Sequence, residues 1–238
     1  MSSGARAAAP LLEARVGPAR VWCTGRAQGN VGDHVGDDPA IVARNRAGLL
    51  ELTGTDPAAG WVWLRQVHGA EVHVATRGTG DESPAADAAV TSVRGLALAV
   101  VTADCAPIVV ANDDAVGVVH AGHRGLAAGV IEATLASLRA VGTGDVRAFL
   151  GPCIRVRHYE FGPDDLARFV AQFGPEVEGR TADGHPALDI PAAIRIVFAR
   201  EGVVAFDDCD VCTADSPAYF SYRRSRDSGR QVTIALLP

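Results

Sequence analysis

Short apolar runs rich in valine and alanine alternate with polar turns through the middle of the chain. The runs 95–102, 107–111 and 115–119 each end at such a turn. Uninterrupted apolar runs of this length are typical of strands that are buried on both faces. The same pattern predicts further strands at 61–67, 70–75, 146–150, 203–206, 219–222 and 231–236.

Helical spacing of apolar residues, together with end signals, predicts four helices between these strands. Asp38 and Pro39 are an N-cap and a first helical residue, and Gly54 follows the last apolar position. A similar pattern starts near Asp189 and ends at Gly202. The predicted helices are 41–52, 126–138, 163–173 and 191–200.

The order of these elements predicts a mixed α/β fold. No internal repeat and no long linker divides the chain, so we expect one domain over residues 1–238. Residues 1–10 look like a loose tail. Polar, glycine-rich loops are expected at 25–36 and 77–86.

Composition narrows the classes of protein to consider. The 238 residues are 48% hydrophobic and 21% charged, with a formal net charge of −6. The chain contains arginine but no lysine, which indicates a compositional bias of the genome more than a functional requirement. An acidic chain with dispersed arginine lacks the basic surface of a nucleic-acid binder. We likewise expect no membrane partner, since no apolar run has the length of a membrane span.

Cysteine usage points to a reducing compartment. Five cysteines at irregular spacing argue against a disulfide framework, so we expect reduced thiols and a cytoplasmic protein. Pro10 and Glu13 interrupt any signal-peptide core. Cys209 and Cys212 form a CxxC pair without a second pair, which favours an incidental or structural role over redox chemistry.

Three polar turns at the ends of predicted strands carry candidate chemistry. They contain His68, the pair Asp104-Cys105, and His120. Two imidazoles and one thiolate can bind zinc and leave a fourth position open, which is typical of a catalytic zinc site. Taken alone, however, each histidine also fits a hydrogen-bonded turn residue and the cysteine a small core residue. The spacing matches no short zinc motif.

Four neighbouring residues are weaker candidates. Asp104 is a candidate general acid or base, or a residue that orients a metal ligand. Arg124, Arg223 and Arg224 are candidates for binding phosphate, because a guanidinium holds oxyanions with two parallel hydrogen bonds. Surface ion pairing is the alternative for each arginine.

Five segments occur in a specific order, and together they resemble a known family. They include Gln66-Val-His68-Gly, Ala103-Asp-Cys105, the stretch 120–125 (His-Ala-Gly-His-Arg-Gly), Leu150-Gly-Pro and the stretch 220–224 (Phe-Ser-Tyr-Arg-Arg). This series resembles the bacterial YfiH-type family of polyphenol oxidase or laccase-domain proteins, purine nucleoside phosphorylases and peptidoglycan editing factors. The resemblance extends from about residue 30 to the last residue.

The resemblance implies both a fold and a metal site. The fold is a single layered α/β domain with β-sheets packed between helices. The positions that bind Zn²⁺ in the family correspond to His68, Cys105 and His120. Copper can bind this site after metal loading, but it is not favoured as the native metal. Copper outcompetes zinc at almost any set of nitrogen and sulfur ligands, so copper activity after loading would not establish a native role.

The chain departs from the family pattern in two places. His123 stands where the family usually has tryptophan, and we expect a tolerated replacement of one planar side chain by another. The alternative is a catalytic His123 that acts as an extra ligand, a proton shuttle or a substrate contact. The stretch 23–30 replaces a Thr-Arg-Gly-Gly-Val-Ser-like stretch, with Arg26 as the candidate equivalent of its arginine.

The function implied by the resemblance is that of a zinc-dependent purine nucleoside phosphorylase, with purine nucleosides and phosphate as substrates. Adenosine deaminase and methylthioadenosine phosphorylase activities are implied as well. In this interpretation Asp104 protonates a leaving amine, and Arg124 or Arg223 positions phosphate. A monomer or a small homo-oligomer is expected.

Four other functions remain as alternatives. The same site could hydrolyse an amide and so edit peptidoglycan precursors. Without metal, Cys105 could act as a nucleophile with His120 or His68 as its base. Copper-dependent oxidation of phenols is disfavoured, because the chain offers one candidate cluster and a laccase needs several coppers. A non-enzymatic partner in division or envelope complexes is disfavoured because such a protein has no need of a metal triad.

Overall fold

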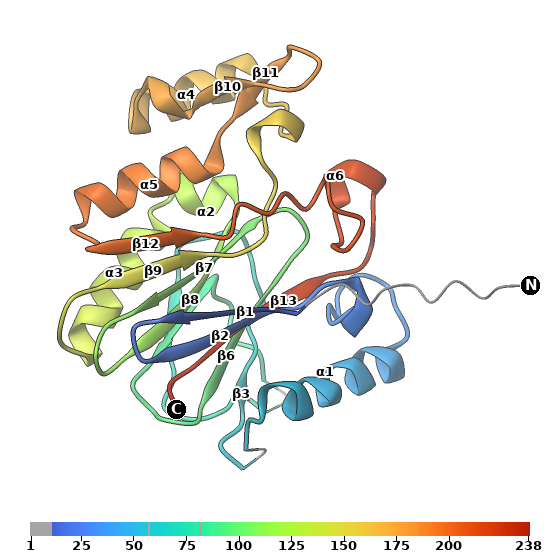
Figure 1. Ribbon diagram of the computed structural model, residues 1–238, viewed down its shortest axis with the longest axis vertical. Coiled ribbons are helices and arrows are strands. Elements are labelled where there is room, and N and C mark those ends of the chain that lie inside the picture. Colours follow the sequence, from blue (N-terminus) through green and yellow to red (C-terminus); the bar gives the residue numbers. More distant parts are fainter. Residues whose placement is uncertain (1–10, 57, 81) are drawn as a thin grey trace, which may run out of the picture.

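Two β-sheets stacked face to face form the centre of the molecule (Figure 1). The computed structural model describes residues 11–56, 58–80 and 82–238. One sheet has the strand order β1 (Leu12–Val16), β2 (Ala19–Cys23), β13 (Gln231–Leu236), β6 (Ala97–Thr102) and β3 (Trp61–Val62). The other has the order β12 (Ala205–Asp208), β9 (Arg147–Leu150), β7 (Ala106–Ala111), β8 (Val116–Ala121), β5 (Ala88–Thr91) and β4 (Val72–Val74).

The apolar runs are buried because both faces of each sheet are covered. Leu98 and Val100 of β6 pack between the sheets against Val109 and Val118 of the six-stranded sheet. Their alternate neighbours, such as Ala99, face the opposite side. Successive side chains of a strand point to opposite faces of the sheet, and both faces are buried here. The runs therefore contain no polar positions.

Helices cover the two outer faces. α1 (Pro39–Thr53) covers the five-stranded sheet, begins at the N-cap Asp38 and ends at Gly54, whose φ is 64°. The helices beyond the six-stranded sheet are α2 (His123–Ala127), α3 (Val130–Val141), α4 (Pro163–Phe173) and α5 (Ile190–Arg200). The fold is therefore a layered α/β structure with sheets between helices, as the resemblance implied.

Smaller elements complete the described chain. A two-stranded sheet pairs β10 (Glu178–Arg180) with β11 (Pro186–Leu188), and α6 (Tyr222–Ser225) is one short turn of helix. The 3₁₀ turns are Arg26–Gln28, Val156–His158 and Pro175–Val177. Within the described residues, no helix combines the length and the apolar character that crossing a membrane requires. The predicted tail, residues 1–10, lies outside the described residues.

Three predicted elements were wrong. The predicted strand 61–67 ends at Val62, because the chain then leaves the sheet edge. The predicted strand 219–222 is a turn that leads into α6, where the hydroxyl of Ser221 accepts a hydrogen bond from Arg224 N. The predicted helix 126–138 is two helices, because Gly129 adopts a left-handed φ of 86° that interrupts the helical backbone.

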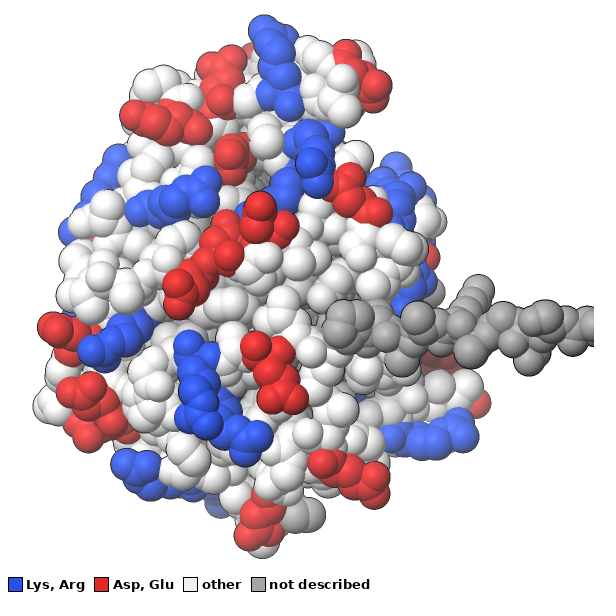
Figure 2. All heavy atoms as spheres, viewed as in Figure 1, with Lys and Arg blue, Asp and Glu red and all other residues white. Residues whose placement is uncertain are grey.

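Charged side chains of both signs are interspersed on the face shown in Figure 2. The described residues also form ion pairs: Arg155 contacts Asp208 at 2.6 Å, and Arg139 contacts Glu201 at 3.0 Å. The net charge of −6 reflects a small excess of acidic over basic residues, many of which lie in ion pairs.

Candidate metal centre

Two loops cross from one sheet to the other at the same end of the stack. The turn at 103–105 joins β6 to β7, and the loop at 63–71 joins β3 to β4. The side chain of Gln66 ties the second loop to β6, since it bonds both the N–H and the carbonyl oxygen of Val101 at 2.8 Å. Residues distant in sequence are thereby brought together at this end of the stack.

At this end of the stack lie three candidate metal ligands: His68, Cys105 and His120. One potential ligand atom of each lies within 4.8 Å of those of the other two. Cys105 Sγ is 4.0 Å from His68 Nε2, and the two imidazole rings are 4.8 Å apart at an interplanar angle of 80°. His120 is buried, Cys105 is half-buried and His68 is exposed. The group is therefore closed at its base and open on the side of His68.

Asp87 supports this group from below, and the sequence analysis missed it. Its buried carboxylate accepts a hydrogen bond from His120 Nδ1 at 2.8 Å, which leaves Nε2 available to a metal. The same carboxylate accepts the backbone N–H groups of Val67, His68 and Gly69 at 2.7–3.1 Å. A signal was present, because an acidic residue inside the apolar stretch 85–90 is unusual unless it is paired.

The hydrogen bonds also set the charge of Asp87. Burial raises its pKa, but the hydrogen bonds from His120 and from the backbone N–H groups outweigh burial and hold the pKa below its usual value. One carboxylate thus remains ionised while it orients His120 and shapes the loop that carries His68.

Cys105 and His120 stabilise each other's charged forms. Burial raises the pKa of Cys105, yet the charge and hydrogen bonds of His120 and His68 lower it to about 6. Burial lowers the pKa of His120, while the Cys105 thiolate and Asp87 raise it to about 9. The group is therefore prepared for a cation: a metal ion would take the place of the His120 proton beside a thiolate.

Gly122 leaves the space that such an ion needs. A Cβ atom at this position would lie 3.2 Å from Cys105 Sγ and 3.0 Å from His68 Cδ2. The φ of Gly122 is −75°, an ordinary value, so the glycine serves the space and not the backbone. Two nitrogen donors and one thiolate around this space fit a three-ligand zinc site.

Strained backbone holds two of the turns in place. His68 has a φ of 60° and Asp104 a φ of 98°, values that L-residues rarely adopt. The carboxylate of Asp104 accepts hydrogen bonds from Thr213 Oγ1 and from the backbone N–H of Arg223, both at 2.7 Å. Asp104 thus anchors the turn that presents Cys105, and both of its oxygens are engaged.

His123 lies beside the group but outside it. Its Nδ1 is 3.1 Å from the hydroxyl of Tyr159, and its ring packs edge-on against Phe161 at 5.3 Å. Burial, followed by the positive charge of Arg124, lowers the pKa of His123. These effects favour the neutral form of the ring, which forms part of an aromatic wall next to the three ligands.

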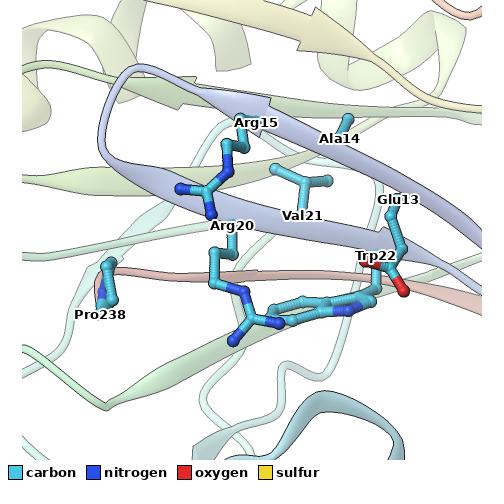
Figure 3. A pocket seen from close by; sticks show the side chains of 7 residues that line it. All are labelled: Glu13, Ala14, Arg15, Arg20, Val21, Trp22 and Pro238. Atoms are coloured by element: carbon cyan, nitrogen blue, oxygen red, sulfur yellow. The ribbon is translucent and has the colours of Figure 1, made fainter.

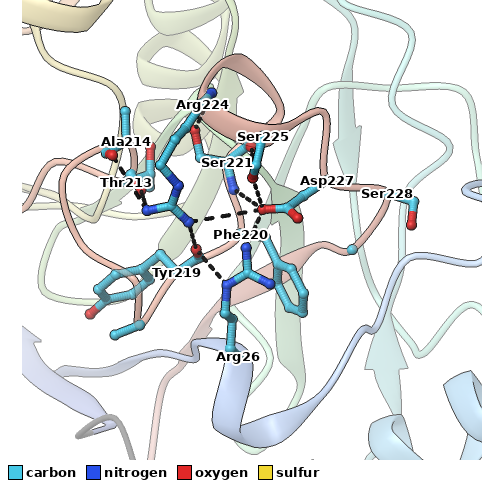
Figure 4. Close-up of polar contacts among 12 residues, drawn as sticks. Arg26, Thr213, Ala214, Tyr219, Phe220, Ser221, Arg224, Ser225, Asp227 and Ser228 are labelled. Carbon is cyan, nitrogen blue, oxygen red and sulfur yellow. Dashed lines mark hydrogen bonds and ion pairs between the residues drawn. The ribbon is translucent and has the colours of Figure 1, made fainter.

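The three candidate arginines differ in their surroundings. Arg124 is exposed on α2. Arg223 lies 4.8 Å above the ring of Tyr159 and donates a hydrogen bond to the carbonyl oxygen of Glu160 at 3.0 Å. Arg224 is bound to backbone: its guanidinium donates to the carbonyl oxygens of Thr213, Ala214, Ser216 and Tyr219 (Figure 4). Arg224 therefore holds a loop together, while the other two remain candidates for contacting substrate.

Arg26 joins the altered N-terminal loop to the C-terminal segment (Figure 4). It forms an ion pair with Asp227 and donates from Nε to the carbonyl oxygen of Tyr219 at 3.0 Å. Its guanidinium also lies 4.6 Å above the ring of Phe220. These contacts assign Arg26 a structural role at the junction of residues 25–30 with residues 219–227.

A second group with metal-binding side chains is already engaged by ion pairs. It consists of His158, Cys212 and Asp215, again with ligand atoms within 4.8 Å of one another. The two carboxylate oxygens of Asp215 contact His158 and Arg157. All five cysteines lie in the described part of the chain and carry free thiols, Cys209 outside both groups.

One surface cavity of about 560 Å³ is separate from the candidate metal centre. It lies on the β1–β2 hairpin next to Pro238, and the guanidinium of Arg20 covers the ring of Trp22 inside it (Figure 3). Its lining contains no histidine or cysteine. The metal centre, with its strained turns and shifted pKa values, is the better candidate for chemistry.

Comparisons with known proteins identify the family of the chain. The family model described as multi-copper polyphenol oxidoreductase laccase matches residues 22–238. A protein of Streptomyces coelicolor named purine nucleoside phosphorylase is 43% identical over 206 residues, which cover 84% of each chain.

Solved structures show the same architecture. A crystal structure of a Neisseria meningitidis protein superimposes with a TM-score of 0.84 at 30% identity, over 95% of this chain and 98% of that one. The crystal structure of a Bacillus licheniformis protein titled YfiH has a TM-score of 0.81 at 23% identity, over 92% of this chain and 93% of that one. By sequence and by fold, the chain belongs to the multi-copper polyphenol oxidoreductase laccase family, to which the YfiH-type proteins are similar.

Proposed function

We propose that the protein is a zinc-dependent purine nucleoside phosphorylase of the cytoplasm, where its five thiols stay reduced. The observation that carries this proposal is the group of His68, Cys105 and His120, which offers three ligands and one open side. Relatives named purine nucleoside phosphorylase support the substrate class. Phosphorolysis of methylthioadenosine and deamination of adenosine are parts of the same proposal.

The reaction exchanges one bond at the sugar. An oxygen of hydrogen phosphate forms a bond to C1′ while the bond from C1′ to the purine nitrogen breaks. The proton of the hydrogen phosphate passes to the departing purine, which leaves sugar 1-phosphate. Zinc would be held by the three ligands and would supply a Lewis acid that stabilises developing negative charge.

The chain's own residues orient the reactants. Arg223 and the exposed Arg124 supply positive charge for phosphate, and His123 and Phe161 offer flat surface for the purine. Both oxygens of Asp104 accept hydrogen bonds. We therefore propose that Asp104 positions Cys105 and does not transfer a proton.

Metal analysis combined with a substrate screen tests the proposal. Protein purified without added metal and without chelator is expected to carry about one zinc per chain. It is expected to release sugar 1-phosphate from inosine, adenosine or guanosine only when phosphate is present. Stoichiometric copper with phenol oxidation, or amide hydrolysis without phosphorolysis, would contradict the proposal and favour an oxidase or an editing amidohydrolase.

A metal-free Cys–His hydrolase is the second candidate. The observation that favours it is the lowered pKa of Cys105 beside two imidazoles, which makes its thiolate available as a nucleophile. A protein free of transition metal that hydrolyses its substrate and is inactivated by iodoacetamide would support this candidate.

Replacement of His123 by tryptophan is expected to preserve turnover within about threefold. The ring of His123 is packed beside Phe161 and lies outside the three-ligand group, so a larger planar side chain can serve in its place. The measurement is turnover of adenosine and inosine at matched zinc content. A loss of roughly 100-fold or more, the scale of general acid–base catalysis, would instead assign His123 a chemical role.

A further inference from the structure

Arg230 lies next to the metal centre, although nothing in its local sequence suggests this. It directly precedes β13, which runs antiparallel to β6 with Gln231 opposite Thr102. This register sets Arg230 across from the turn that follows β6, the turn that carries Asp104 and Cys105. The arginine therefore reaches the site through sheet pairing, from more than a hundred residues away.

The backbone and the aliphatic stem of Arg230 are fixed by the glycine-rich loop at 29–36. Its N–H donates to Asn30 Oδ1 at 2.8 Å, and its carbonyl oxygen accepts from Val31 N at 3.1 Å. A Cβ atom on Gly32 would lie 2.7 Å from Arg230 Cγ, so the glycine lets the loop press directly on the stem. The side chain is held in one place before any ligand arrives.

The guanidinium is held on one side only. Nη1 donates to the carbonyl oxygens of Asp227, Ser228 and Gly229 at 2.9–3.3 Å. Among the described residues, Nε and Nη2 have no hydrogen-bond partner, and no carboxylate approaches Arg230 within 4.0 Å. Nε and Nη2 form the edge with which arginine binds an oxyanion through two parallel hydrogen bonds.

The surroundings make an anionic ligand favourable. Arg230 is half-buried, and burial outweighs the nearby negative charges of Cys105 and Asp104, so its pKa lies below the usual value. Arg26 and Arg155, in contrast, each form an ion pair with a carboxylate. A half-buried cation without a paired carboxylate gains most from an anion that binds beside it.

We propose that Arg230 binds the phosphate co-substrate through its Nε/Nη2 edge, beside the turn that carries Cys105. This inference rests on the proposed phosphorolysis and assigns its phosphate subsite to a residue outside the three arginines that the sequence suggested. Arg230 presents phosphate to C1′, while Asn30 holds its backbone and Gly32 lies against its stem.

The test compares Arg230→Gln with Arg226→Gln, a matched control in the same segment. Arg226 is exposed, and its guanidinium contacts the hydroxyl of Tyr222. In inosine phosphorolysis at matched zinc content, Arg230→Gln is expected to raise the KM for phosphate roughly tenfold or more, the scale of one charge-assisted bidentate contact. The KM for inosine is expected to change less than about twofold, and Arg226→Gln is expected to leave both constants unchanged.

Each outcome is informative. If wild type phosphorolyses inosine but Arg230→Gln leaves the phosphate KM unchanged, the phosphate subsite is refuted and the proposed function stands. If wild type shows no phosphorolysis, calorimetric binding of inorganic phosphate to the zinc-loaded protein decides. Binding that weakens roughly tenfold in Arg230→Gln but not in Arg226→Gln supports the subsite, and equal or absent binding overturns it.

A second variant covers the case in which Arg230→Gln fails to fold. Arg230→Lys keeps the positive charge but loses the planar edge of the guanidinium. Its phosphate KM is expected to rise while its zinc content and its KM for inosine stay near those of wild type. An unchanged phosphate KM in Arg230→Lys would contradict the proposed two-hydrogen-bond contact.

Discussion

Cys105→Ala is expected to abolish both metal binding and catalysis. Cys105 supplies the one thiolate of the three-ligand group, and its low pKa shows that the site stabilises the charged form a metal needs. Two neutral imidazoles without the thiolate would bind zinc far more weakly. The measurements are zinc per chain by elemental analysis and turnover of inosine with phosphate.

Cys209→Ala is the matched control for this experiment. Cys209 is also half-buried, but it lies outside both groups of metal-binding side chains. We expect this variant to keep its zinc and its turnover. Full zinc occupancy in Cys105→Ala would remove Cys105 from the metal site, and retained hydrolysis without metal would point to a different active site.

Asp87→Asn is expected to weaken zinc binding by roughly 10- to 100-fold. Each carboxylate oxygen of Asp87 accepts two hydrogen bonds. In asparagine, an NH₂ group would replace one of these oxygens and face two N–H donors that it cannot accept. His120 and the loop that carries His68 would lose their common support. Unpaired buried donors are also expected to lower the free energy of unfolding by about 1–3 kcal/mol.

Zinc affinity is measured by competition with a chromogenic chelator, and stability by urea unfolding of the metal-free proteins. The control Asp207→Asn changes an exposed carboxylate on β12 and is expected to alter neither quantity. Wild-type zinc affinity in Asp87→Asn would show that the hydrogen bond to His120 does not tune the metal site.

Locally encoded parts of the structure could be predicted from the sequence. The helices that begin at Asp38 and Asp189 have N-caps whose side chains accept the predicted hydrogen bonds, because capping involves only neighbouring residues. The buried strands of the centre were also found, since burial on both faces leaves an apolar run. The strand predicted at 219–222 was wrong, because apolar content alone does not provide a neighbouring strand.

Some residues of the candidate site could be found from the sequence, and others only from the structure. From the residues alone, His68, Cys105 and His120 were three side chains at strand ends, and only the family resemblance joined them. Loops that cross between the sheets bring His68 and Cys105 to His120, which lies within β8 and not in the predicted turn. Asp87 stood out only as an acidic residue in an apolar stretch, and the sequence does not show which groups it bonds. Arg230 was missed because its place depends on strand register between distant segments, which leaves no local signal.

The position of β13 has a consequence for the order in which the protein is made. This strand lies between β2 and β6, so the centre of the five-stranded sheet comes from residues 231–236. During synthesis on the ribosome, β2 and β6 emerge long before their shared neighbour, and neither can complete its ladder of hydrogen bonds. The arginine edge beside Cys105 arrives with that same late segment. A nascent chain can therefore present all three metal ligands while it still lacks the strand that completes the sheet behind them.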